Sequence, residues 1–133
     1  MAIKSHDTLS DMKTKAKSGT ASQKTVLSKG SNLTIASGVI TVTDSFHLVN
    51  TEGAASTDDL TTINSSTAAT PGQVLALMAA DDGDTVVVKN SSSIVLGGDI
   101  SLLNDTDLLQ LMWTGSKWVI LAKSPDLGKY PWL

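Results

Sequence analysis

Short apolar runs separated by turn-forming residues fill the second half of the chain. Between Gly72 and Lys123, the runs QVLALMA, TVVVK, IVL and DLLQLMW end at DDGD, NSSS, GGD and TGS, and KWVIL follows. Short apolar runs bounded by Gly, Asp, Asn and Ser are typical of β-strands joined by turns. A spacing of roughly 8–12 residues between turns is typical of all-β sandwiches and barrels. The pattern therefore predicts a strand at each run.

Residues 33–72 show the same pattern with shorter runs. The segment 33–43, LTIASGVITVT, predicts two strands joined by a tight turn at ASG, where the glycine takes a positive φ. Further strands are expected at 45–51 and 60–63. The segment 64–72 ends in Pro-Gly, a strong turn signal, and is expected to be a loop.

Several of the predicted strands are apolar on both faces. A strand of a small antiparallel sandwich needs only one apolar face, and burying a Leu or Val side chain contributes roughly 1.5–3 kcal/mol. We therefore expect the second faces to meet other copies of the chain, as in the apolar centre of an obligate interface. The alternative is that the N-terminal residues or the inner layer of the sandwich cover them. The expected subunit interface consists of six apolar residues: Leu75, Leu77, Leu108, Met112, Val119 and Leu121.

The first 30 residues differ from the rest in charge and in apolar content. Residues 1–30 carry six lysines and two aspartates, a net charge of +4, whereas residues 31–133 carry four lysines and eleven acidic residues, a net charge of −7. Because this segment has few large apolar side chains, we expect an extended arm, either solvated or ordered on an acidic protein surface. All ten cations are lysines and the arm has no aromatic residue, which disfavours nucleic acid as a partner. The expected contact residues are Lys4, Lys13, Lys15 and Lys17.

The three tryptophans and the single tyrosine all follow residue 112. Trp113 and Trp118 flank the turn TGS and are expected to pair across a hairpin. The last nine residues, 125–133, read PDLGKYPWL, and large apolar groups at a terminus are a liability in water. We expect this tail to dock through three residues on its own subunit, on a neighbouring subunit or on another protein: Tyr130, Trp132 and Leu133.

These patterns predict one all-β domain with two appendages. The fold class is a jelly-roll-like antiparallel β-sandwich over residues 31–124, preceded by the extended arm 1–30 and followed by the docking tail 125–133. No run approaches the ~20 apolar residues of a transmembrane helix, and the N-terminus has no apolar leader. The chain is therefore expected to be made in a cytoplasm and not to enter a membrane.

Candidate chemistry is sparse. His6 and His47 are far apart in the sequence and the chain has no cysteine, which disfavours a zinc site; His47 is expected to fill a sheet face or an interface. Asp81, Asp82 and Asp84 resemble half of a calcium loop but fit a β-turn better. Paired aspartates could in principle hydrolyse a glycoside, yet their spacing does not favour it, and no GxSxG elbow or phosphate loop is present. We expect no catalytic residue, no cofactor and no metal.

The order of the β-rich segments carries a family resemblance. TIASGVITVTDSFHLVNTEGAASTDDLTTIN, then PGQVLALMAADDGDTVVVKN, then IVLGGDISLLNDTDLLQLMWTGSKWVILAKS resemble a module of tailed-phage virion proteins, namely tail-fibre, head-fibre and capsid-decoration proteins. The resemblance covers about residues 33–124. The loop at 64–72 and the tail after Ser124 depart from the family pattern.

The resemblance implies a non-enzymatic β domain on a phage particle, acting as a homotrimer. The expected function is capsid decoration or cementing, with the arm and tail binding major capsid proteins or other virion proteins at the capsid surface after synthesis in the host cytoplasm. Two alternatives remain open. One is a head- or tail-fibre domain whose loops at 52–58 and 64–72 contact a host-surface receptor, and the other is a small hydrolase.

Overall fold

The computed structural model describes residues 25–124, so the four arm lysines and the three tail residues expected to make contacts lie outside the described part. The described part contains eleven strands and one short 3-10 helix. Their bounds are β1 (Leu33–Thr34), β2 (Val39–Val42), β3 (Phe46–Asn50), η1 (Glu52–Ala54), β4 (Thr57–Leu60), β5 (Thr62–Ser65), β6 (Val74–Ala79), β7 (Thr85–Val88), β8 (Ile94–Val95), β9 (Ile100–Leu102), β10 (Leu108–Trp113) and β11 (Trp118–Lys123).

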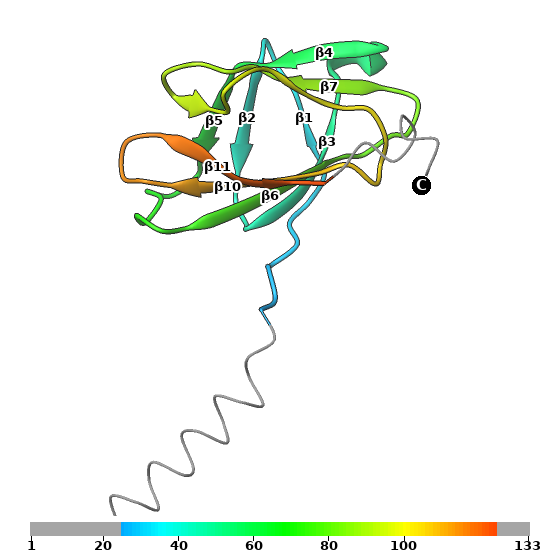
Figure 1. The fold of residues 1–133 in the computed structure, drawn as a ribbon. Coiled ribbons are helices and arrows are strands. Elements are labelled where there is room, and N and C mark those ends of the chain that lie inside the picture. Colours follow the sequence, from blue (N-terminus) through cyan, green and yellow to red (C-terminus); the bar gives the residue numbers. More distant parts are fainter. Residues whose placement is uncertain (1–24, 125–133) are drawn as a thin grey trace, which may run out of the picture.

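The strands form three sheets that enclose one core. The large sheet has six strands in the order β1-β3-β6-β10-β11-β8, a second sheet pairs β2 with β5, and a third has the order β4-β7-β9. Figure 1 shows β4 and β7 on one side of the molecule and β6 and β10 on the opposite side, with β2 and β5 between them. Buried side chains from all three sheets belong to a single apolar cluster.

Six strands trace the same path around this core twice. β2, β3 and β4 visit the two-stranded, the large and the three-stranded sheet in that order, and β5, β6 and β7 then visit them in the same order. Each strand of the second turn pairs in parallel with its counterpart in the first. A parallel pair needs a long crossover between its strands, and here the strands of the other two sheets supply it. This part of the chain is a two-turn coil with three faces.

The remaining strands complete the sheets. β9 pairs antiparallel with β7, β10 with β6, and β11 with β10, while β1 and β8 add parallel edges to the large sheet. The predicted hairpin of β10 and β11 is confirmed: Trp113 lies opposite Trp118, and the two ring centroids are 5.2 Å apart. The aromatic pair packs at the closed end of this hairpin.

The predicted all-β class is confirmed, but the predicted antiparallel pairing is wrong for most of the fold. Five of the eight ladders are parallel, and a jelly-roll arrangement is not observed. The physical reason lies in the turns. The turn at 81–84 joins β6 to β7, which belong to different sheets, so this turn leads the chain around a corner and not back along a neighbouring strand.

The turn at Ser37 and Gly38 shows the same behaviour. Ala36 and Val39 exchange two backbone hydrogen bonds of 3.0 Å, and the residues between them have φ values of 51° and 80°. Two consecutive positive φ values are typical of a two-residue turn, so the tight turn predicted from the sequence is confirmed. The strands on either side, β1 and β2, nevertheless belong to different sheets.

The domain begins slightly before the predicted boundary at residue 31. Gly30 N donates to Phe46 O at 2.8 Å, and Phe46 N donates to Ser28 O at 3.0 Å. Residues 28–30 therefore run as a short parallel partner of β3. No helix in the described part of the chain is long and apolar enough to cross a membrane.

Candidate functional site

The face of the large sheet that points away from the core is largely apolar over its central strands. The pairing register assigns residues to this face, because directly opposed residues point to the same side of a sheet. On the core side, Leu77 lies opposite both His47 and Leu109, and all three are fully buried. The residues between them alternate to the other side. We call the central part of this side the outer face; its strand residues are Phe46, Leu48, Val74, Ala76, Met78, Val95, Leu108, Gln110, Met112 and Val119. The same side continues around it at Thr34, Asn50 and Ala122.

The outer face carries no charged side chain at these ten positions. Apart from Ala76, which is 2% exposed beneath its neighbours, the ten side chains are half-buried. In Figure 1 the other two sheets lie on one side of β6 and β10, and the outer face is the side away from them. An apolar sheet face whose side chains keep part of their surface accessible is a candidate interaction site.

A β-bulge lies between β10 and β11, two strands that contribute to the outer face. The register between β10 and β11 shifts between Gln110 and Leu111, so that Leu121 has no direct partner on β10. Its side chain is 49% exposed, and it is one of two strongly exposed large apolar residues in the described part of the chain. Bulges commonly occur where a sheet must redirect a side chain. Here the bulge adds an exposed leucine beside the outer face.

The structure corrects part of the predicted subunit interface. Leu75 and Leu77 are 0% exposed and belong to the chain's own core, so neither has surface left for a partner. The alternation along β6 separates two apolar faces, and the predicted interface used the face that forms the core. The remaining four predicted residues keep accessible surface: Leu108, Met112, Val119 and Leu121.

Five apolar residues of the outer face larger than alanine were absent from the predicted interface: Phe46, Leu48, Val74, Met78 and Val95. Val74 lies opposite Met112, and Met78 lies opposite Leu108; Met112 and Leu108 were both in the predicted interface. Met78 is also paired with Leu48. Phe46 lies beside them, opposite Ala76. The missing signal was the strand register, because alternation within one strand cannot show which of its two apolar faces matches that of a neighbour.

His47 lies on the interior face of β3. Of the two environments predicted for it, a sheet face and an interface, the structure shows the sheet face. It is fully buried, and its two ring nitrogens have three backbone partners. In the described part of the chain, no group of three or more His, Asp or Glu side chains is placed to hold a metal ion.

The aspartates of the β6–β7 turn border a shallow hollow. Gly83 N donates to Asp81 Oδ1 at 2.8 Å, which is the bond expected when an aspartate stabilises its own turn. Asp81 and Asp84 line a hollow of about 270 Å³ together with Thr34, Asn50, Thr51, Gly53 and Ala54. The predicted turn is confirmed.

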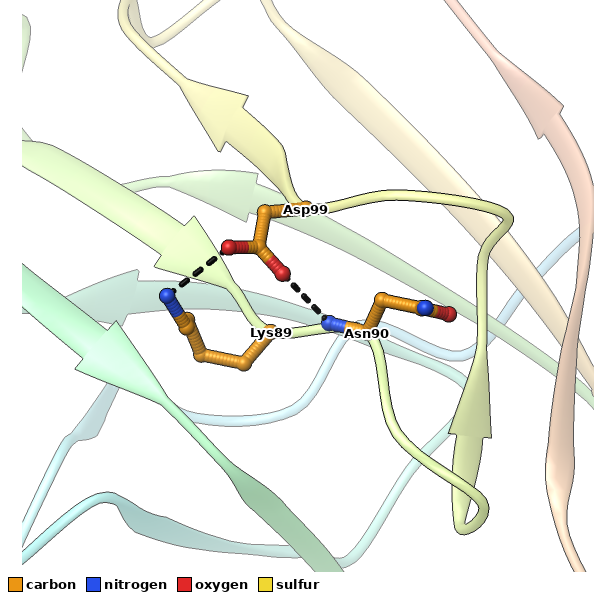
Figure 2. Close-up of polar contacts among 3 residues, drawn as sticks. All are labelled: Lys89, Asn90 and Asp99. Atoms are coloured by element: carbon orange, nitrogen blue, oxygen red, sulfur yellow. Dashed lines mark hydrogen bonds and ion pairs between the residues drawn. The ribbon is translucent and has the colours of Figure 1, made fainter.

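A small polar network closes the opposite end of β7 (Figure 2). Lys89 Nζ and Asp99 Oδ2 are 2.8 Å apart, and Asn90 N donates to Asp99 Oδ1 at 2.8 Å. The Asn90 side chain in turn accepts bonds from Leu96 N and Gly97 N. The hydrogen bond to Asp99 and its charge raise the pKa of Lys89, and the hydrogen bonds from Lys89 and Asn90 N lower the pKa of Asp99.

This network is structural in character. It links the end of β7 to the loop that precedes β9, and both charged side chains are open to solvent, 37% and 44% exposed. Its two charges satisfy one another, and its backbone bond fixes the loop. The outer face is therefore the feature of the described residues best suited to a partner.

No protein-family model matches the chain, and no curated protein matches it significantly.

Proposed function

We propose that this chain is a non-enzymatic structural protein of a bacteriophage particle, of the capsid-decoration or cement type, that assembles as a homotrimer through the outer face. The observation that carries the proposal is the outer face itself, with its half-buried, uncharged side chains on a sheet whose other side already forms the core. The resemblance of residues 33–124 to phage virion modules supports the same conclusion.

The chemistry of the outer face favours a second copy of the chain as its occupant. The ten positions of the outer face carry no charge, and only Lys29 lies opposite one of them, at Phe46, so most of the face would neither attract a charged partner nor repel an identical face. Leu48, Met78 and Met112 present flexible or branched apolar groups, and methionines adapt readily to an opposing apolar surface. The apolar centre of an obligate homo-oligomer has this character.

The N-terminal segment supplies the proposed contact with the capsid. It carries a net charge of +4 over residues 1–30, and it enters the domain where Lys29 pairs with Phe46, at the border of the outer face. In a trimer, three such segments start from one assembly. Three linked weak contacts then bind more tightly than one through their effective concentration.

Light scattering on the purified full-length chain tests the assembly. We expect the mass of a trimer, and we expect Met78→Glu to give a monomer because it places a charge in the centre of the outer face. Thr41→Glu, on an exposed position of β2, is the matched control and keeps the trimer. A monomeric wild-type chain would contradict the proposed trimer.

Binding to phage heads that lack their decoration proteins tests the role on the particle. We expect the wild-type trimer to co-sediment with such heads and the Met78→Glu chain to bind far more weakly. A trimer that ignores the heads and binds host cells would replace the decoration role by that of a fibre or receptor-binding domain.

A further inference from the structure

The hydrogen bonds of His47 fix the protonation state of its ring. Nε2 lies 3.1 Å from Thr43 N and 3.0 Å from Asp44 N, and Nδ1 lies 2.7 Å from Ser31 O. A backbone N–H can only donate, so Nε2 must be an unprotonated acceptor. The single ring proton is then on Nδ1 and is donated to Ser31 O. All three bonds require the neutral imidazole.

These bonds support the segment by which the N-terminal residues are attached. The backbone amides bound by Nε2 belong to the turn that precedes β3, and the carbonyl bound by Nδ1 belongs to the incoming chain. The same turn holds Ser28 twice, through Ser28 N to Ser45 Oγ at 2.7 Å and Ser28 Oγ to Asp44 Oδ1 at 3.1 Å. The imidazole thus joins the turn to residues 28–31 from inside the domain.

We propose that His47 is an acid-sensitive latch that holds residues 28–31 against β3 while its ring is neutral and releases them when the ring gains a second proton. A proton on Nε2 would point at the amides of Thr43 and Asp44, so both buried donors would lose their acceptor. Histidine is the side chain whose charge ordinarily changes in the mildly acidic range.

Two charged groups, Asp44 and Lys29, lie near the ring or near the segment that it supports. A Cβ built on Gly30 would overlap both His47 Cε1 and Asp44 Oδ2, so the ring and this carboxylate flank the same glycine. The Lys29 ammonium lies 3.5 Å from Gly30 O, on the segment that the ring supports. From β6, the ring meets the apolar Leu77, which is its register partner.

The Asp44 carboxylate is another acceptor close to the ring. Its two oxygens already accept from Ser28 Oγ and from Thr43 Oγ1, the latter at 2.8 Å. A charged ring that turned toward this carboxylate would leave the amides of Thr43 and Asp44 without an acceptor. The latch therefore opens in acid although a carboxylate lies close by.

A fluorophore near the attachment point measures the latch directly. The chain has no cysteine, and Val26 is 77% exposed, so Val26→Cys accepts a single label on the full-length protein. We expect the anisotropy of the label to fall between about pH 8 and about pH 5. The near-UV signal of the Trp113–Trp118 pair should persist over this range, because the release is local.

Two histidine variants locate the titrating group. His47→Gln removes the titrating ring and should abolish the fall in anisotropy, whereas His6→Gln, which removes the only other histidine, should leave it unchanged. A fall that survives His47→Gln, or that disappears in His6→Gln, would overturn the latch.

NMR of the imidazole nitrogens in the unmutated chain covers the case in which His47→Gln does not fold. We expect the Nδ1–H tautomer at neutral pH, and ring protonation at the pH at which the Gly30 amide loses its bond to Phe46 O. A ring that gains its proton while the Gly30 amide keeps that bond would refute the proposal.

Discussion

At the scale of single residues, the ion pair of Lys89 and Asp99 shows how a surface interaction can shape a loop. Asp99 receives both a charged side chain and the backbone N–H of Asn90, so it fixes the loop before β9 onto the end of β7. The pair is open to solvent, and an exposed pair contributes little stability through charge alone. Its effect on stability should therefore be small but dependent on pH.

We expect Asp99→Asn to destabilise the domain slightly near pH 7 and not at all in strong acid. The folded chain lowers the pKa of Asp99 below its ordinary value of 3.8, so the unfolded chain takes up the proton first as the pH falls. The contribution is complete above that value and is lost as the pH drops through the folded pKa. The Lys89 pKa, raised above 10.5, limits the contribution only in strong alkali.

Urea unfolding of the wild-type chain and of Asp99→Asn at neutral pH and at about pH 2 measures this difference. Asp105→Asn, which changes another exposed aspartate, is the control for the loss of one negative charge. A difference between wild type and Asp99→Asn that is equally large at both pH values would disprove the assignment.

Gly38 offers a second test at the residue scale. Its φ is 80°, and a Cβ at this position would lie 2.6 Å from Thr61 Oγ1. Gly38→Ala should therefore lower the free energy of unfolding by about 1–3 kcal/mol from the backbone conformation alone, and by more from the overlap. Gly97→Ala separates the two effects, because Gly97 has a φ of 82° and no atom within 4 Å of its Cβ. Equal losses in the two variants would show that Thr61 moves away freely.

At the scale of elements, β6 shows how far sequence patterns reach. Alternation correctly indicated two apolar faces on this strand. It could not rank them, because Leu75 and Leu77 on one side and Val74 and Met78 on the other are all plausible core residues. Only the register with β3 and β10, which joins residues far apart in the chain, decides which side meets the other sheets.

The two faces of β6 should respond differently to truncation. Leu77→Ala removes a side chain that is 0% exposed, and we expect it to lower the free energy of unfolding by about 2–5 kcal/mol. Met78→Ala removes a half-buried side chain of the outer face and should cost the isolated subunit less, while weakening self-association. Urea unfolding and light scattering on both variants measure the two effects. A Leu77→Ala chain that is fully stable but monomeric would restore the original interface assignment.

Strand existence and strand pairing differ in how local their causes are. The strands at Val74–Ala79, Thr85–Val88 and Leu108–Trp113 are set by neighbouring residues and were predicted closely. The prediction of a single strand at 60–63 was wrong, because β4 ends at Leu60 and β5 begins at Thr62 in a different sheet. The strand β9 was missed, because ISL carries a weak apolar signal. Parallel pairing depends on which segments meet after a full turn of the coil, and no local pattern encodes it.

In the candidate site, too, features with partners close in sequence were predicted and features that combine distant segments were not. The hairpin of Trp113 and Trp118 and the turn at Asp81 were predicted because their partners are close in sequence. The outer face was only half predicted, because it combines β3, β6, β10 and β11. The hydrogen bonds of His47 to Ser31 O and to the amides of Thr43 and Asp44 were not predicted. Every residue other than proline has the same backbone groups, so the sequence does not show which of them a side chain will contact.

At the scale of the whole molecule, the proposed trimer makes stability depend on protein concentration. The coil buries the inner face of the large sheet within one chain, but the outer face would be covered only by other copies. A folded state that is stabilised by association shifts its unfolding temperature upward as concentration rises, whereas a monomer does not. Under the proposed trimer, the outer face would link the stability of each subunit to assembly.

We expect the melting temperature of the wild-type chain to rise over a hundredfold increase in concentration, and that of Met78→Glu to remain constant. Thr41→Glu, on the exposed side of β2, should retain the rise. Differential scanning calorimetry at several concentrations measures all three. If the wild-type melting temperature did not change while light scattering still gave a trimer, the subunits would associate without stabilising one another. The outer face would then be a weak contact surface, and tight binding to the proposed capsid partner would have to come from the N-terminal segment alone.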